Sequence, residues 1–567
     1  MAMDKKWTIQ SCDAEQCSRL GDALGIHPVL CRLLANRGIG TFEDARRFFR
    51  PSPAELHDPW LMKDMDKAVQ RLETAVSRGE KILVYGDYDV DGTTAVAVVY
   101  DFLLPFCPAI DFYIPHRYRE GYGLSAEGIR HAGENGVTLL ICLDCGIKAV
   151  DKIAFARTLG IDVIVCDHHL PGAALPPATA ILNPKQPGCP YPYKELSGCG
   201  IGFKLIQAWA GKRNIPEQQV LRYLDLVATS IAADIVPLTG ENRALAFYGL
   251  KQANEQPSAG LKALIEQSGL KKTLHISDLV FSVAPRVNAA GRMDDARKAV
   301  LLFIEQEQER AREYAAQLHR DNLERKEADA DITREALELL SEQPVRSTTV
   351  LFKPHWHKGV VGIVASRLME SYYRPTIVLT RSGEQVAGSA RSVSGFNICE
   401  ALHACRDLLD NYGGHAYAAG MTLKPENVAA FGQRFESVVA GSIDPALLVP
   451  EIRIDAEIQL QDITPRFYRI LSQFEPFGPD NNRPVFMVRN LRDTGYSRIV
   501  KEAHLRLEVR DESGIRMKGI GFNLACKYPL VRDNAAFDLC FTLEENEWNG
   551  YTTLQLNITD IRSAEPA

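Results

Sequence analysis

The chain has 567 residues, too many for one compact domain, and its length indicates three or four domains of ordinary size. Its 65 basic and 72 acidic side chains leave a net charge of −7, and 46% of the residues are apolar. This composition excludes a disordered chain, a collagen-like repeat and a small disulfide-rich protein. A mildly acidic chain can still act on nucleic acid through a local basic groove.

Membrane and secretory features are not expected. No apolar run reaches the ~20 residues that a membrane helix needs, and the first residues contain no apolar signal segment. The 13 cysteines are scattered through the chain, which favours reduced thiols and a cytoplasmic location.

The first half of the chain changes from a helical to an alternating pattern. Residues 1–75 are predicted to be helical, in segments that each end at Gly or Pro. From residue 76 to residue 300, apolar runs alternate with helical stretches, and the runs include KILVYGD, AIDFYIP, VTLLICLD and DVIVCDHH. Such runs are typical of parallel strands buried on both faces, so we predict an α/β domain with a parallel sheet.

Three further regions follow. Residues 301–345 are strongly charged and lack Gly and Pro until Pro344, which predicts a long connecting helix with a solvated face. Residues 346–447 return to mixed α/β with two glycine-rich segments. Residues 448–567 alternate short strands at even spacing, which favours a small β-barrel of the OB type.

Acidic side chains and imidazoles follow three of the predicted strands. GDYDVDGTT (residues 86–94) carries alternating aspartates, which an extended chain directs to one side. The next strands end at Asp144 and at the Asp-His-His sequence of residues 167–169. Ligand sites of parallel sheets lie at the carboxyl ends of strands. We therefore expect these residues to meet at one edge: Asp87, Asp89, Asp91, Asp144, Asp167, His168 and His169.

These acids favour divalent cations. Asp234 in IAADIVPL is a further acid that we expect to be buried. Close carboxylates raise one another's pKa unless positive charge is present. Oxygen ligands with one or two imidazoles suit Mn²⁺ or Mg²⁺, and two such ions can activate water for phosphoester hydrolysis. A single aspartate at a strand end is usually a helix cap or turn residue, but six aspartates and two histidines together favour a metal site.

Other segments have competing interpretations. Ser389, Arg391 and Ser392 in GSARS suit a phosphate group, as do Arg286, Asn288 and Arg292 in RVNAAGRM, although a surface ion pair is the ordinary role of a single arginine. The pair Cys142 and Cys145 has no second pair at zinc spacing. GCGIGFK (residues 198–204) lacks the phosphate-loop pattern and favours a closely packed helix start. His355 and His357 favour a structural or substrate-loop role.

The motifs GDYDVDGTT, LDCG, DHH and AADIVPL resemble those of the DHH phosphoesterase superfamily, and within it the chain resembles the RecJ family. IPHRYREGYGLS, APRVNAAGRMDDA, GSARSVSGFNICEAL and GGHAYAAGMTL extend this resemblance over nearly the whole chain. Two positions depart from the family pattern: Cys145 stands where Asn is more usual, and Pro479 to Asn482 replace an expected Gly-Asn-Pro.

The resemblance implies a set of site residues. It implies two metal ions bridged by Asp144, one held also by Asp87 and Asp89 and the other by Asp91, His168 and Asp234. His169 would face the scissile phosphate as a catalytic residue, and Asp167 would orient it. GGHAYAAGM resembles a DHHA1 segment, which implies that Gly414 and His415 contact the substrate.

The resemblance also implies a function and a domain order. Residues 76–300 would be a DHH catalytic domain, residues 346–447 a DHHA1 substrate-binding domain and residues 448–567 a nucleic-acid-binding barrel. The implied activity is a Mn²⁺- or Mg²⁺-dependent 5′→3′ exonuclease that degrades single-stranded DNA to mononucleotides in recombination and repair. We expect a monomer, with a single-strand-binding protein and a helicase as partners.

Two alternatives remain open. The first is a DHH phosphohydrolase of short oligonucleotides, cyclic dinucleotides or pyrophosphate. The second is an inactive binding subunit, which would have no need of the metal-binding acids.

Overall fold

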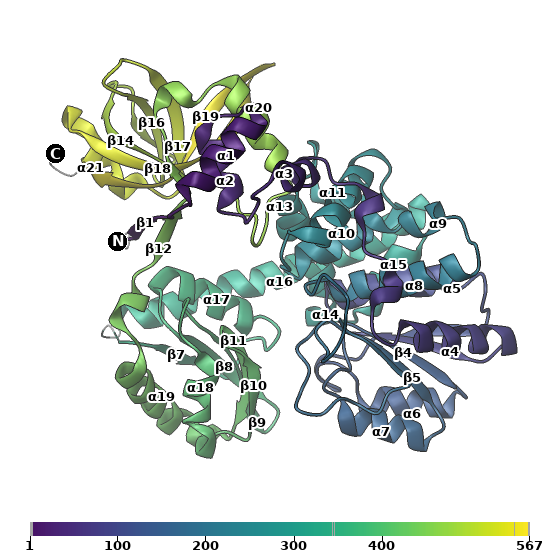
Figure 1. The fold of residues 1–567 in the computed structure, drawn as a ribbon. Helices are drawn as coiled ribbons and strands as arrows, with labels where there is room; N and C mark the ends of the chain where they lie inside the picture. The colour runs from purple at the N-terminus through teal and green to yellow at the C-terminus, as the bar shows by residue number, and fades with distance from the viewer. Residues whose placement is uncertain (1–3, 343, 345, 549, 565–567) are drawn as a thin grey trace. The chain divides into compact units, whose positions relative to one another are not determined.

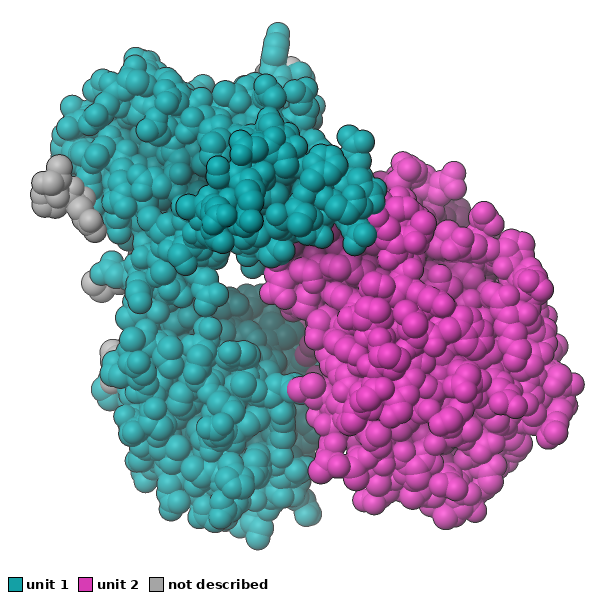
Figure 2. Space-filling model, viewed as in Figure 1, with its two compact units in different colours: residues 1–50, 329–475, 482–567 teal, residues 51–328, 476–481 magenta. Residues whose placement is uncertain are grey.

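The computed structural model describes residues 4–342, 344, 346–548 and 550–564. The chain divides into two compact units, coloured separately in Figure 2. Unit 1 comprises residues 1–50, 329–475 and 482–567, and unit 2 comprises residues 51–328 and 476–481. Among the described residues, no helix is both long and apolar enough to cross a membrane.

Unit 2 is built on a five-stranded parallel sheet with the strand order β3-β2-β4-β5-β6. The strands are β2 (Ile82–Gly86), β3 (Ile110–Tyr113), β4 (Leu139–Leu143), β5 (Asp162–Cys166) and β6 (Ala180–Leu182). Strand β3 lies on one side of β2, whereas β4, β5 and β6 lie on its other side. The carboxyl ends of β2 and β4 therefore flank a topological switch point, where open α/β sheets bind ligands.

Both faces of this sheet are covered by helices, as Figure 1 shows. Successive side chains of a strand point to opposite faces. Ile82 and Val84 thus join one hydrophobic cluster, and Leu83 and Tyr85 join another. The first face is covered by α4 (Met65–Arg78), α5 (Val90–Leu103) and α8 (Gly198–Lys212), and the second by α6 (Ala126–Glu134) and α7 (Val150–Thr158).

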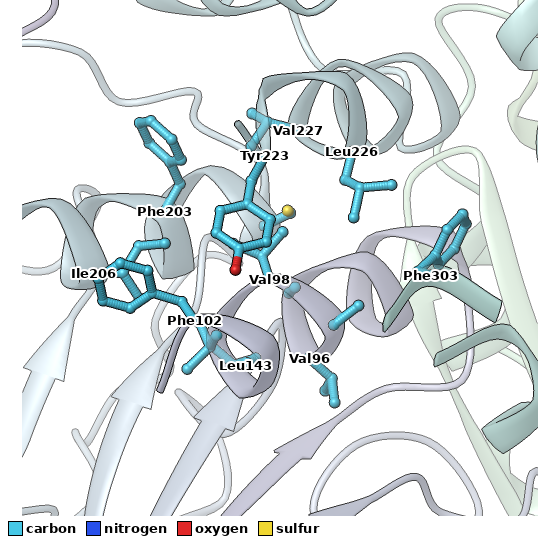
Figure 3. Close-up of a cluster of buried hydrophobic side chains, with 14 of the residues drawn as sticks. Val96, Val98, Phe102, Leu143, Phe203, Ile206, Tyr223, Leu226, Val227 and Phe303 are labelled. Carbon is cyan, nitrogen blue, oxygen red and sulfur yellow. The ribbon is translucent and has the colours of Figure 1, made fainter. Parts of the chain in front are cut away.

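Helix α5 lies at the centre of the larger cluster, because it is apolar on nearly all sides. Figure 3 shows Val96, Val98 and Phe102 of this helix among side chains of α8 and of α10 (Leu224–Ala233). The remaining helices of unit 2 are α9 (Gln218–Leu221), α11 (Gly240–Glu255), α12 (Ala259–Ser268), α13 (Ile276–Asp278), α14 (Ala284–Met293) and α15 (Arg297–Ile304). A π-helical turn, Leu279–Val283, leads directly into α14.

The predicted long helix is shorter than expected at its beginning. Helix α15 ends at Ile304, and α16 (Gln308–Ser341) begins only after an extended residue, Glu305. The Glu305 carboxylate accepts the backbone N–H groups of Gln306 and Glu307, so a local side-chain cap interrupts the helix. The 34 residues of α16 still span about 50 Å. Residues 343 and 345 of the predicted helix lie outside the described residues.

Unit 1 contains a mixed five-stranded sheet in the order β10-β11-β9-β8-β7. Its strands are β7 (Thr349–Phe352), β8 (Thr376–Ser382), β9 (Gln385–Arg391), β10 (Asn411–His415) and β11 (Ala418–Leu423). Three helices pack with it: α17 (Val361–Tyr372), α18 (Ile398–His403) and α19 (Val428–Ser442). Only β7 and β8 pair in parallel.

The last part of unit 1 is a closed barrel. Strand β14 pairs with both β18 and β16, so the ring β14-β18-β19-β17-β16 closes. Its strands are β14 (Phe486–Asp493), β16 (His504–Arg510), β17 (Arg516–Gly521), β18 (Phe537–Trp548) and β19 (Tyr551–Ser563). Short strands β13 (Ala456–Glu457) and β15 (Arg498–Val500) and helices α20 (Pro465–Leu471) and α21 (Tyr528–Val531) flank it. The predicted fold class, two α/β domains and an OB-like barrel, is confirmed.

The first residues differ from the all-helical prediction. A strand, β1 (Lys6–Ile9), pairs in parallel with β12 (Glu451–Ile454), and the Trp7 indole N–H donates to Asp560 at 2.9 Å. Helices α1 (Ala14–Leu24), α2 (Pro28–Ala35) and α3 (Phe42–Phe49) follow. A strand whose partner lies more than 400 residues away leaves no local sequence pattern, which explains the difference.

Candidate metal centre and substrate-binding residues

The loops after β2, β4 and β5 bring the predicted acids and imidazoles to one edge of the unit 2 sheet. Asp87 directly follows β2, Asp144 follows β4, and Asp167 begins the Asp-His-His sequence after β5. Asp144 adopts a left-handed conformation with φ of +57°, which is uncommon for a residue other than Gly. Strained backbone of this kind is frequent at functional sites.

Asp91 is held by the beginning of another helix. Its carboxylate accepts the backbone N–H groups of Gly198 at 2.6 Å and Cys199 at 2.7 Å, both in the first turn of α8. It also accepts the Ser230 hydroxyl at 2.6 Å. The N-terminus of a helix stabilises a negative charge, so GCGIGFK binds a carboxylate of the protein itself. The predicted close packing is present too, because a Cβ at Gly198 would lie 2.6 Å from the Asp144 Cβ.

His168 lies at the centre of the acids. Its Nε2 atom is 3.2 Å from Asp144 Oδ1, 3.5 Å from Asp234 Oδ2 and 3.8 Å from Asp91 Oδ2. Asp91, His168 and Asp234 offer ligand atoms within 4.8 Å of one another, and so do Asp144, His168 and His169. Asp234 is placed there by α10, which it caps at the C-terminal end.

His169 is oriented by hydrogen bonds on both ring nitrogens. Its Nδ1 atom lies 2.7 Å from Asp167 Oδ1, and its Nε2 atom lies 3.1 Å from the Tyr122 hydroxyl. A carboxylate oxygen only accepts, so Nδ1 is the donor to Asp167. Asp167 also accepts the Ile147 N–H at 2.9 Å, which fixes the carboxylate that orients the ring.

Asp87 and Asp89 are candidate metal ligands that also form hydrogen bonds with nearby backbone N–H groups. Asp89 caps α5, because its Oδ1 accepts the Gly92 N–H at 3.0 Å. Asp87 Oδ1 accepts the Gly123 N–H at 3.2 Å, while its buried Oδ2 has no hydrogen-bond partner. A Cβ at Gly92 would lie 2.4 Å from the Asp87 carbonyl oxygen, so only glycine permits this tight turn.

The electrostatics of this cluster fit divalent cations. Burial, followed by repulsion from neighbouring acids, raises the pKa of four carboxyl groups above the ordinary range: Asp87, Asp89, Asp144 and Asp234. Burial lowers the pKa of His168, which leaves a neutral imidazole able to act as a ligand. Asp144 Oδ1 and His168 Nε2 are buried and lack hydrogen-bond partners. Oxygen and imidazole ligands of this kind suit Mn²⁺ or Mg²⁺.

Asp167 and His169 behave as a pair. Burial would raise the pKa of Asp167, but the hydrogen bond and charge of His169 lower it below the ordinary value. Burial would lower the pKa of His169, but the hydrogen bond with Asp167 raises it. Both shifts favour an ionised Asp167 that supports the imidazole.

The first predicted phosphate-binding set lies on β9 of unit 1. The Arg391 guanidinium donates to the Ser389 hydroxyl at 2.9 Å and to the Ser366 hydroxyl at 3.0 Å. A Cβ at Gly362 would lie 3.0 Å from the Ser389 hydroxyl and 3.2 Å from Arg391 Nη2, so this glycine keeps the space beside both groups open. Ser392 is buried, and its hydroxyl donates to the Phe396 carbonyl oxygen.

Gly414 and His415 lie next to this set. Strand β11 pairs with both β9 and β10, and it brings His415 opposite Ala418, which in turn pairs with Arg391. Gly414 has a φ of +156°, and a Cβ there would lie 2.2 Å from the Ala418 carbonyl oxygen. The five residues Ser389, Arg391, Ser392, Gly414 and His415 thus share one region of the unit 1 sheet.

The second predicted set lies on α14 of unit 2. Arg286 is buried and donates to the Ser282 carbonyl oxygen and to His319 Nδ1. Asn288 is half-buried, and the Arg292 carbonyl oxygen accepts the Tyr118 hydroxyl. Arg286 therefore contacts its own unit, and a phosphate contact by these three residues stays a prediction.

Several residues of the site were not found from the sequence. Ser230 holds Asp91 and is itself in contact with Ser197. Tyr122 contacts His169, and the Asn183 side chain donates to the His169 carbonyl oxygen at 2.9 Å. Ser230 and Asp234 are one helical turn apart, a spacing that points to the same helix face, but no pattern connects Ser230 with Asp91. Cys142 and Cys145 are both buried in unit 2, and no metal group of the described residues includes either.

Three family models match the chain: the DHH family N-terminal domain over residues 81–231, the DHHA1 domain over 324–441 and the RecJ OB domain over 454–560. The single-stranded-DNA-specific exonuclease RecJ of Bacillus subtilis is 38% identical over 100% of this chain and 72% of its own length. The RecJ of Salmonella typhimurium is 37% identical over 94% of this chain and 96% of its own.

Solved structures agree with these matches. The crystal structure of RecJ from Thermus thermophilus in complex with Mn²⁺ is similar, with a TM-score of 0.86 and 29% identity. The match covers 99% of this chain and 80% of that chain. The Mg²⁺ complex of the same protein gives a TM-score of 0.80 over 99% of this chain and 79% of that chain, at 28% identity.

Proposed function

The chain belongs to the RecJ family, and from this premise we propose that it is a metal-dependent exonuclease that degrades single-stranded DNA in the 5′→3′ direction to mononucleotides. The observation that carries the proposal is the cluster around His168. Asp87 and Asp144 are buried, Asp234 is half-buried, and the pKa of each of the three is raised. Three ligand atoms of the cluster also lack hydrogen-bond partners, an arrangement that a divalent cation would stabilise.

The ligands divide between two ions in this proposal. Asp87 and Asp89 would hold one Mn²⁺ or Mg²⁺ ion, and Asp91, His168 and Asp234 would hold the other, with Asp144 between them. Bound in this way, the ions supply an activated water and neutralise charge on the phosphodiester. The fixed hydrogen bonds of Asp91 and Asp167 keep the ligands and His169 in place before substrate arrives.

His169 is the proposed catalytic residue that touches the scissile phosphate. Asp167 fixes its tautomer and its ring plane, because Nδ1 donates to that carboxylate. When the ring is protonated, its Nε2–H group can donate to a phosphate oxygen or to the leaving group, after exchange of the Tyr122 hydroxyl. Ser389, Arg391 and His415 are the proposed phosphate-binding residues of unit 1.

The barrel supplies a surface suited to a single strand. Arg506 and Arg510 on β16 are exposed, and they lie opposite Arg498 and Arg516 on the neighbouring strands. Like charges in directly opposed positions destabilise a sheet, so a bound polyanion would relieve their repulsion. Exposed Tyr496 and Phe522 nearby are of the type on which bases stack.

The first experiment follows label release from single-stranded DNA labelled at the 5′ or the 3′ end, with Mn²⁺, Mg²⁺ or EDTA. We expect early loss of the 5′ label, with metal only, and no loss from a matched blunt duplex. Early loss of the 3′ label would contradict the polarity. If DNA stays intact while a dinucleotide or pyrophosphate is hydrolysed, the protein would be a phosphohydrolase of small substrates and not an exonuclease.

Removing a metal ligand separates hydrolysis from binding. Asp89→Ala should abolish hydrolysis, because one proposed cation loses a carboxylate, while binding of a single strand stays close to that of the unchanged protein. Binding is measured by fluorescence anisotropy in Ca²⁺ or EDTA. Asp151→Asn, an exposed acid of α7, is the matched control and should retain full activity. Unchanged hydrolysis by Asp89→Ala would refute the site assignment.

A single-strand-binding protein and a helicase remain the predicted partners, and a monomer in the cytoplasm remains the predicted state. Co-purification and light scattering test these two predictions.

A further inference from the structure

Asp91 has an unusually complete set of hydrogen bonds for a proposed metal ligand. Its Oδ1 atom accepts the Cys199 N–H at 2.7 Å and the Ser230 hydroxyl at 2.6 Å, and its Oδ2 atom accepts the Gly198 N–H at 2.6 Å. Each carboxylate oxygen offers about two acceptor positions. Both acceptor positions of Oδ1 are therefore occupied, and only Oδ2 keeps an acceptor position that a cation could take. Oδ2 is also the oxygen that faces His168 Nε2, at 3.8 Å.

From this geometry we propose that Ser230 is a positioning residue that makes Asp91 bind its cation through Oδ2 alone. The inference rests on the proposed function in one respect, namely that Asp91 is a metal ligand. The torsion about the Cβ–Cγ bond of aspartate is broad, so the two N–H groups of the helix N-terminus alone leave the carboxylate plane free to turn until both oxygens face the metal site. The Ser230 hydroxyl removes this freedom because it occupies the remaining position on Oδ1.

The Ser230 hydroxyl donates its hydrogen bond to Asp91. Ser230 and Ser197 hydroxyl oxygens lie 2.7 Å apart, and both side chains are fully buried. The Asp91 carboxylate can only accept, so the Ser230 hydroxyl is the donor in that contact, and the Ser197 hydroxyl oxygen lies within hydrogen-bond distance of the same Ser230 hydroxyl. Ser197 is also the N-cap of α8, where it accepts the Gly200 N–H at 3.1 Å. The residue that caps α8 thus also contacts the hydroxyl that holds Asp91.

Ser230 also connects two proposed ligands of the same cation. Its carbonyl oxygen accepts the Asp234 N–H at 2.9 Å, one turn along the end of α10. Its side chain holds Asp91, and its backbone holds the residue that carries the second carboxylate. Asp91, His168 and Asp234 have ligand atoms within 4.8 Å of one another, so a small movement of either acid changes the spacing that a cation requires.

The test is Mn²⁺ binding to the full chain by isothermal titration calorimetry, which needs no DNA and no turnover. Ser230→Ala should weaken one of the two binding steps by about 10- to 100-fold, the usual effect of removing a group that orients a metal ligand, and leave the other step unchanged. Half-maximal activation should need correspondingly more Mn²⁺. Ser230→Thr keeps the hydroxyl and should restore most of the affinity.

Thr229→Val is the matched control. Thr229 is also fully buried on α10, but its hydroxyl donates only to the Asp225 carbonyl oxygen in the same helix, so the variant should bind Mn²⁺ normally. Normal binding by Ser230→Ala would overturn the inference, as would equal weakening by Thr229→Val. If Ser230→Ala does not fold, Ser230→Cys is compared with Ser230→Thr, and equal affinities of these two would overturn it as well. Failure of the unchanged protein to bind Mn²⁺ would instead refute the proposed metal site.

Discussion

At the residue scale, the site depends on its glycines as much as on its acidic and imidazole side chains. Gly92 permits the turn after Asp87, and Gly198 lies against Asp144 while its N–H holds Asp91. The glycines of GCGIGFK suggested only close packing when judged by sequence. The structure adds that this packing positions two of the proposed ligands, one through a contact and one through a hydrogen bond.

Gly198→Ala tests this arrangement. The new methyl group would lie 2.6 Å from the Asp144 Cβ and 2.9 Å from its Cα, so the β4 loop must move. We expect hydrolysis to fall by at least about 100-fold with weakened Mn²⁺ binding, because ligands must be placed to within a fraction of an ångström. Gly211→Ala, at the other end of α8 with open space around it, should have no effect on activity. Equal activity of the two variants would contradict this role of Gly198.

At the element scale, α8 and α11 are joined by a buried ion pair. Lys204 Nζ lies 2.6 Å from Glu241 Oε1, and both side chains are fully buried. The Glu241 carboxylate also accepts the Tyr191 hydroxyl at 2.7 Å, and Lys204 donates to the His57 carbonyl oxygen at 2.8 Å. The pair therefore links the helix that holds Asp91 to two further segments of unit 2.

Lys204→Met should destabilise the protein by about 3–5 kcal/mol, because it leaves the Glu241 charge buried without its partner. The double variant Lys204→Met with Glu241→Leu should recover much of this loss. Urea unfolding monitored by circular dichroism measures both, and Lys212→Met on the exposed end of α8 is the control. A double variant no more stable than the single one would argue against an uncompensated charge as the cause.

Glu80 forms a second link between elements, and its contribution to the stability of the fold depends on pH. Burial would raise the pKa of Glu80, but hydrogen bonds from Thr138 and Arg71 lower it below the ordinary value. A lowered pKa means that Glu80 stabilises the fold above the pKa of the unfolded chain, and that this contribution disappears as the pH falls through the folded value. Glu80→Gln should therefore be less stable than the unchanged protein at pH 7, with a difference that shrinks toward pH 3. A difference independent of pH would contradict this account.

At the scale of the whole molecule, both units are assembled from segments that are distant in the sequence. Strand β12, just before the barrel, pairs with β1, and residues 476–481 belong to unit 2, where the Leu238 N–H donates to Pro479 at 2.8 Å. Residues 479–481 of the segment that departs from the family pattern thus belong to unit 2. Truncation near residue 450 would remove these contacts together with the barrel, so surface substitutions test the barrel more cleanly.

The variant Arg506→Ala/Arg516→Ala/Lys518→Ala removes three exposed cations from β16 and β17. If each contacts a phosphate, the slope of log affinity for single-stranded DNA against log salt should become less steep by about 2. KM for long single strands should rise, and hydrolysis of a dinucleotide should stay the same. The control Arg130→Ala/Lys152→Ala/Arg157→Ala removes three exposed cations of α6 and α7. Equal salt slopes in both variants would contradict a strand-binding barrel.

The sequence by itself determined the parts of this protein that depend on local patterns. Buried parallel strands are continuous apolar runs, so β2, β4 and β5 were evident, and so were the aspartates and histidines at their carboxyl ends. Strand β1, the break at Glu305 and the hydrogen bonds on Asp91 were not evident. They depend on β12, on a side-chain cap and on the meeting of α5, α8 and α10. The break at Glu305 is a local competition between a side-chain cap and the helix, whereas only the tertiary structure decided strand β1 and the hydrogen bonds on Asp91, because packing joins residues that are more than 100 positions apart in the chain.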